Sequence, residues 1–224
     1  MTPLCPSFPA SRRCCSTANQ LARRLLALLM MVGLAVTIQV GSAGGEGTDD
    51  IEVRVAKADG FTYRELEPVR PIVMFPISVK AAGANHASRL SNPWGDVADP
   101  SRFVAPGQVE KLIRSGYLAT AYDSLVTTMA TVQPASSLAL LNRVANHFSA
   151  RHALVPVDVV IDGSDDHYAL DAMFVLVDLK SGHPRLIMSA GNTLAGKEAA
   201  KSAPQAEVAT QTFRAVLTAL RERT

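Results

Sequence analysis

The part of the sequence whose residue types could do chemistry is a group of acidic residues beside a histidine. Asp162, Asp165, Asp166 and His167 lie within one short segment. Carboxylates at close spacing bind hard cations, so one hypothesis is a metal site. The spacing fits no EF-hand loop, and Asp-Gly-Ser-Asp-Asp is also ordinary turn chemistry. We favour a turn over a metal site and assign no catalytic residue, metal ligand or cofactor.

Two histidines and the serines give no stronger signal for catalysis. His147 and His152 flank the end of a predicted helix, but a spacing of five residues does not place both on one helical face, so zinc ligation is disfavoured. A cation favoured at a helix C-terminus is the simpler interpretation of both. The sequence has no Gly-x-Ser-x-Gly elbow and no Ser-x-x-Lys pattern. These observations favour a protein that is not an enzyme.

A long segment without periodicity, Ala81 to Gly107, contains the candidate partner-binding residues. They are Trp94, Asn92 and His86. A loop of this length in a compact domain is either functional or mobile, and tryptophan is enriched at interface hot spots. The alternative is that Trp94 packs the loop against the body of the protein.

The first 43 residues have the pattern of a signal peptide. Arg23 and Arg24 precede an apolar run from Leu25 to Val40, and Gly-Ser-Ala follows, so we expect cleavage after Ala43. The alternative is an uncleaved membrane anchor over residues 25–43, because about 20 apolar residues span a bilayer. All 3 cysteines of the chain lie in this leader, so the remainder can form no disulfide. A secreted domain without disulfides suits a bacterial periplasm.

The charge of the chain excludes one class of partner. The formal net charge is +2, but the leader contributes four arginines and no acidic residue. The remainder is therefore slightly acidic, and a nucleic-acid-binding surface is not expected.

The elements that must position these residues are read from hydrophobic periodicity. Three consecutive strands are predicted between Ala153 and Ala190, with a loop from Gly191 to Lys201. The middle strand, Tyr168 to Leu179, is apolar on both faces from Ala172 onwards and should be central. The other predicted elements are an edge strand at Ile51 to Val55, a buried strand at Pro71 to Lys80 interrupted at Pro76, a helix at Gln108 to Val132 with Tyr117 in its apolar stripe, a second helix to about Arg151, and a last helix after the capping box Ser202 to Gln205.

This order predicts an α/β fold in which a mixed sheet with an antiparallel three-stranded meander is covered by two to three helices. Residues 71–224 would form a single domain. Residues 44–70 would be a flexible N-terminal segment with an edge strand.

The order of elements resembles a group of bacterial envelope proteins. The matching features are the buried strand from Pro71 to Lys80, the strand Ala153 to Val157, and a long strand ending in the hairpin Asp178 to Gly182. The group comprises CsgG-like proteins, lipoprotein activators of penicillin-binding proteins and the TolB amino-terminal domain. Those families commonly carry a lipid-modified cysteine after the signal, and this chain has none there. The resemblance implies a non-catalytic protein that binds other envelope components.

The leading hypothesis is therefore an exported periplasmic or envelope protein that acts as an assembly or accessory factor through protein–protein interaction. It would contact the membrane only through an uncleaved leader. One alternative is an exported hydrolase or metal-dependent enzyme with its site near residues 162–167. Another is a small-ligand binding module in which the long loop acts as a lid.

Overall fold

The computed structural model describes residues 39–42, 51–66, 70–81, 87–89, 99–164, 167–195 and 204–222. All of them belong to one compact unit, residues 35–224. In chain order the elements are β1 (Gln39–Ser42), β2 (Glu52–Lys57), the 3-10 helix η1 (Tyr63–Leu66), β3 (Ile72–Met74), β4 (Ser78–Ala81), β5 (Ala87–Arg89), β6 (Phe103–Val104), α2 (Pro106–Ser115), α3 (Ala119–Ala130), α4 (Ala139–Phe148), β7 (His152–Ser164), β8 (His167–Asp178), β9 (Pro184–Ala195) and α5 (Pro204–Arg221).

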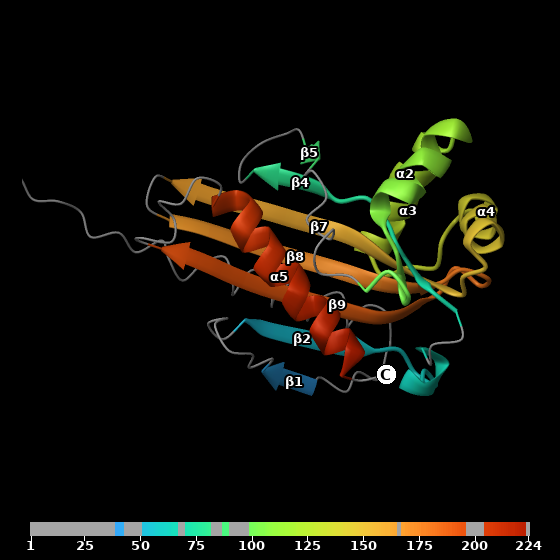
Figure 1. Ribbon diagram of the computed structural model, residues 1–224. Helices are drawn as coiled ribbons and strands as arrows, with labels where there is room; N and C mark the ends of the chain where they lie inside the picture. Colours follow the sequence, from blue (N-terminus) through green and yellow to red (C-terminus); the bar gives the residue numbers. More distant parts are fainter. Residues whose placement is uncertain are drawn as a thin grey trace, which may run out of the picture. The chain divides into compact units, whose positions relative to one another are not determined.

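The strands form one mixed sheet in the order β1-β2-β9-β8-β7-β3-β6, with β4 also on β7 and β5 on β4 (Figure 1). The meander β7-β8-β9 is antiparallel, whereas β3 and β4 run parallel to β7. The predicted α/β class with an antiparallel meander is therefore confirmed. The middle strand is central as expected, and residues 172–178 of β8 are all buried.

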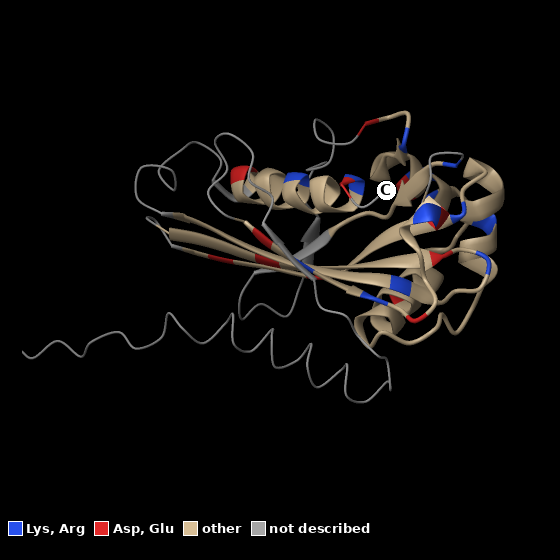
Figure 2. Cartoon of the chain, turned by 90° about the horizontal axis from the view of Figure 1, so that it is seen from below, with Lys and Arg blue, Asp and Glu red and all other residues tan. Residues whose placement is uncertain are grey.

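Helices pack on both faces of the sheet. Helix α5 lies along one face (Figures 1 and 2), where Phe213 meets Phe174 edge to face with ring centroids 5.4 Å apart. Aromatic pairs of this kind add to the burial of their area. At one end of the other face, Tyr122 of α3 stacks on Phe75 at 5.6 Å and donates a hydrogen bond to the carbonyl of Pro76. The sheet is thus covered by helices on both faces.

The predicted helix from Gln108 to Val132 is wrong as a single element. It is two helices, α2 and α3, because Gly116 ends the first and Tyr117 takes a left-handed conformation with φ 53°. The backbone N–H of Leu118 then returns to the carbonyl of Ile113. Tyr117, placed by periodicity in the apolar stripe, is 95% exposed.

Three predicted strands also differ from the strands observed. The run from Pro71 to Lys80 is divided into β3 and β4 around Pro76, as the proline indicated. Strand β9 continues to Ala195, so the loop predicted from Gly191 is wrong up to that residue. Strand β2 is not at an edge, because β1 pairs with it through Gln39 to Ser42. Those four residues lie inside the predicted leader.

Candidate functional site

The predicted acidic group lies at the tip of the first hairpin of the meander. Asp162 is exposed near the end of β7, two residues before the Ser164–His167 pair that closes the hairpin, and His167 is exposed at the start of β8. Asp165 and Asp166 lie outside the described residues, as do Trp94, Asn92 and His86. Within the part of the chain that the structure describes, no three His, Cys, Asp or Glu side chains are grouped to hold a metal ion.

Further along the same hairpin, Asp171 is half-buried on β8. Its pKa is raised above the ordinary value, first by burial and then by the negative charge of Asp158 on β7. Its carboxylate also packs against β9, because Oδ1 lies 3.0 Å from the position a Cβ would take at Gly191. This end of the sheet brings carboxylates together, and no ion pair among the described residues neutralises Asp171.

A cleft of about 1020 Å³ opens at the opposite end of the sheet. Its walls come from η1, the residues leading into β3, the C-terminal part of α4, the start of β7 and the turn after β8. The polar and charged side chains that line it are Arg64, Glu65, Arg70, Asn142, Asn146, Ser149, Arg151, His152, Asp178 and Lys180. It therefore combines segments that are far apart in the sequence.

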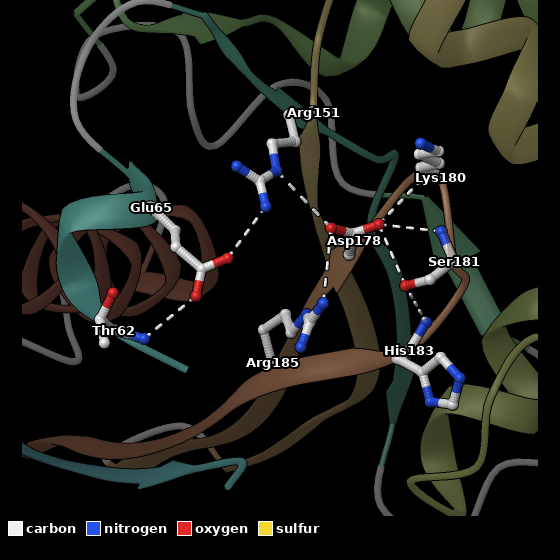
Figure 3. Close-up of polar contacts among 8 residues, drawn as sticks. All are labelled: Thr62, Glu65, Arg151, Asp178, Lys180, Ser181, His183 and Arg185. Atoms are coloured by element: carbon white, nitrogen blue, oxygen red, sulfur yellow. Dashed lines mark hydrogen bonds and ion pairs between the residues drawn. The ribbon is translucent and has the colours of Figure 1, made fainter. Parts of the chain in front are cut away.

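Asp178 organises the turn at the edge of this cleft (Figure 3). Its Oδ1 accepts hydrogen bonds from the backbone N–H of Lys180 at 3.0 Å and from the N–H and hydroxyl of Ser181 at 2.8 and 3.0 Å. Its Oδ2 lies 3.7 Å from Arg151 Nε and 3.7 Å from Arg185 Nη2. Burial raises the pKa of this carboxyl, but the Ser181 hydrogen bonds and the Arg185 charge outweigh it and leave the pKa below its ordinary value.

Arg151 joins the turn to η1. Its Nη2 lies 3.0 Å from Glu65 Oε2, and the other oxygen of Glu65 accepts a hydrogen bond from the N–H of Thr62 at 3.2 Å (Figure 3). Glu65 and Arg151 are 86 residues apart in the chain. Both carboxylates of the cleft are therefore bound by the protein's own donors.

His152 lies among the residues lining the cleft and is 3% exposed. Its ring meets Phe61 edge to face, and its Nε2 is buried with no hydrogen-bond partner among the described residues. Burial lowers the pKa of this imidazole to about 4, against the opposing charge of Asp178. The sequence interpretation of His152 as a helix-terminal cation is therefore wrong, because α4 ends at Phe148 and His152 begins β7 as a neutral side chain.

Three cations of the cleft remain available to a ligand. Arg64, Arg70 and Lys180 are exposed, and none of their side chains takes part in an ion pair among the described residues. On the same rim, Asn142 and Asn146 are exposed on α4 without side-chain hydrogen bonds inside that part of the chain. The described lining thus has four basic side chains against two carboxylates that are already bound.

The sequence does not indicate this cleft, because Asp178 and Gly182 stand out in it only as a hairpin pattern. The signal available was an aspartate directly before a tight turn, which indicates side chain to backbone hydrogen bonding in that turn. Nothing in the spacing of Glu65, Arg151 and Asp178 indicates that they meet.

No protein-family model and no curated protein matches the chain. Among solved structures it is similar to the PelC dodecamer from Paraburkholderia phytofirmans, at 15% identity and a TM-score of 0.37 over 77% of this chain and 98% of that one. A variant of that dodecamer matches with a TM-score of 0.36, at 15% identity over 77% of this chain and 99% of that one. The LpoB C-terminal domain from Salmonella enterica matches at 11% identity and a TM-score of 0.24, over 62% of this chain and 87% of that domain.

None of the helices in the described ranges is long and apolar enough to cross a membrane.

Proposed function

We propose that this protein is an exported, non-catalytic component of the bacterial envelope that acts as an assembly or accessory factor by binding other envelope proteins. The observation that carries the proposal is the pairing of the charged side chains in the cleft. Its two carboxylates are held by Arg151, Thr62 and the Ser181 turn, whereas Arg64 and Arg70 form no ion pair with any residue that the structure describes. The site is therefore organised to recognise charge.

The titration of the cleft also supports binding over acid–base catalysis. A general acid or base works best with a pKa near the operating pH. The pKa of Asp178 is held below its ordinary value, and burial lowers that of His152 to about 4. At neutral pH the first is ionised and the second is neutral, so neither is suited to proton transfer.

Export rests on the leader, whose residues 39–42 form strand β1 of the sheet. If cleavage occurs after Ala43, the mature chain begins at Gly44 and loses β1. Strand β2 then becomes the edge strand that its alternating pattern predicts. Intact-mass measurement of the protein from its native host tests this directly: a first residue of Gly44 supports export with cleavage, and a retained Met1 in the cytoplasmic fraction contradicts it.

The binding function is tested by capture from the native envelope. The full chain, expressed from its own start codon with a C-terminal tag, is cross-linked in cells and purified under denaturing conditions. We expect one or a few envelope proteins in near-stoichiometric amounts, absent when an unrelated exported protein is treated in the same way. Recovery of the protein alone would contradict an accessory role.

A further inference from the structure

We propose that the cleft between η1 and α4 is a binding site for a carboxylate-bearing peptide segment, held by Arg64, Arg70 and Lys180. This inference rests on the proposed binding function and gives it a site and a ligand chemistry. Three properties of the cleft support it: its charge, its prior organisation and its size.

The charge of the cleft selects an anion. Arginine side chains recognise carboxylates through paired hydrogen bonds, and lysine contributes a point charge. Arg64 lies on η1, Arg70 precedes β3 and Lys180 lies in the turn after β8, so the three cations come from three separate segments around one opening. Cations converging from separate segments form an electropositive surface, and among the described residues no carboxylate of the cleft pairs with them.

The cleft is organised before a ligand arrives. Arg151 is held between Glu65 and Asp178, so it fixes η1 to the end of the sheet instead of serving the ligand. Lys180 is placed by its own backbone N–H, which bonds to Asp178. A preformed site avoids part of the ordering cost of binding, which favours affinity.

The size and the remaining polar groups favour a peptide over a small carboxylate. The cleft volume of about 1020 Å³ is at the upper end of the range for small-molecule sites. Asn142 and Asn146 lie four residues apart on α4, hence on one face of that helix, and line the cleft. Each amide offers both a donor and an acceptor, which complements the N–H and C=O groups of a peptide backbone.

The test uses fluorescein-labelled deca-glutamate as the probe and fluorescence anisotropy at low ionic strength with the full chain. We expect saturable binding that weakens as salt is added, because exposed charges are screened. The double variant Arg64→Glu/Arg70→Glu should raise the Kd at least tenfold. The variant Lys180→Glu should raise it by a smaller factor.

A matched control changes the same amount of charge elsewhere. Lys111 on α2 and Arg214 on α5 are exposed and do not line the cleft, so Lys111→Glu/Arg214→Glu should leave the Kd within twofold of the wild type. Melting temperatures of all variants show whether each is folded. An equal loss in the control and the cleft variant would mean non-specific attraction and would overturn the site.

A second readout reports occupancy of the cleft itself. The imidazole signals of His152, assigned by comparison with His152→Phe, should shift when deca-glutamate is added, whereas those of His167 at the other end of the sheet should not. Deca-lysine should cause no shift. Unmoved His152 signals at saturating deca-glutamate would overturn the proposal.

Competition experiments distinguish a peptide from a small carboxylate as the ligand of the cleft. If citrate displaces the probe as well as unlabelled deca-glutamate does at the same carboxylate concentration, the assignment to a peptide is wrong. If deca-glutamate does not bind although an envelope partner is captured in cells, the cleft assignment fails and the binding function stands. If no partner is captured, the function fails whatever the peptide does.

Discussion

The two hairpins of the meander both contain aspartates, yet these acidic groups have opposite surroundings. At the β7–β8 hairpin, Asp162 is exposed. Further along this hairpin, burial and the negative charge of Asp158 raise the pKa of Asp171. At the β8–β9 hairpin, Asp178 is bound by its own turn and lies beside two arginines, and its pKa is lowered.

The difference between them shows that residue type alone does not identify a site. Figure 2 shows basic segments around the end of the sheet where the shorter helices gather, and acidic segments on strands at the other end. The β7–β8 hairpin has the more acidic sequence, whereas Asp178 of the β8–β9 hairpin has the hydrogen-bond and ion-pair partners. The positions of the basic residues therefore decide which end can recognise an anion.

The largest effect on stability should come from removing Asp178. We expect Asp178→Ala to cost about 2–3 kcal/mol, because hydrogen bonds to a charged acceptor are lost and two N–H groups of the turn lose their partner. The matched change Asp162→Ala at the exposed hairpin should stay within about 0.5 kcal/mol. Urea unfolding of both variants measures the contrast. Equal losses would show that the two hairpins are equivalent.

Glycine substitutions should also destabilise the β8–β9 hairpin more than the β7–β8 hairpin, with a smaller difference between the two. Gly182 has φ +71°, and a Cβ there would lie 2.7 Å from Leu138 Cδ2 and 3.0 Å from Ala135 Cβ. We expect Gly182→Ala to destabilise by about 1–2 kcal/mol, since strain and overpacking add. Gly163 lacks the positive φ, and its added Cβ would meet the ring of Tyr168, which is only partly buried.

Because Tyr168 is only partly buried, we expect its ring to shift towards solvent, so Gly163→Ala should cost less than about 1 kcal/mol. The measurement for both variants is the shift in melting temperature, which should be larger for Gly182→Ala. A larger shift for Gly163→Ala would indicate that the first hairpin is the more tightly packed of the two.

The sequence predicts the fold correctly where a feature depends on the residues of a single element. Alternating apolar residues located the meander, and Pro76 located the break between β3 and β4. It failed where backbone geometry depends on neighbours: nothing local shows that Tyr117 adopts a positive φ and separates α2 from α3. It also failed for the cleft, because the pairing of Glu65 with Arg151 exists only once η1 is placed against the end of the sheet.

The two ends of the sheet should affect the pH dependence of stability in opposite directions. His152 has a folded pKa of about 4 against an ordinary value of 6.5, so the folded state binds fewer protons between these values. The contribution of neutral His152 to the free energy of unfolding is present above pH 6.5 and is lost as the pH falls towards 4. Asp178, with a lowered pKa, loses its contribution only at a lower pH, below the ordinary value of 3.8.

Asp171 has a raised pKa, so its protonated form is favoured in the folded state. Its effect is therefore stabilising at acid pH and unfavourable once the pH rises through the folded pKa. We expect His152→Phe to flatten the loss of stability between pH 6.5 and 4, and Asp171→Asn to stabilise the protein at neutral pH but not at pH 4. Urea unfolding across pH 4–7.5 tests both, and a slope unchanged by His152→Phe would show that another group titrates in this window.

The most direct test of the account compares the two ends of the sheet in living cells. A photo-crosslinking amino acid, p-benzoylphenylalanine, is placed at Asn146 beside the cleft or at the exposed Thr193 on β9 at the far end of the meander. We predict a discrete crosslinked adduct with an envelope protein from position 146, reduced by Arg64→Glu/Arg70→Glu, and none from position 193. An adduct from position 193 with none from position 146 would contradict the assignment of recognition to the cleft.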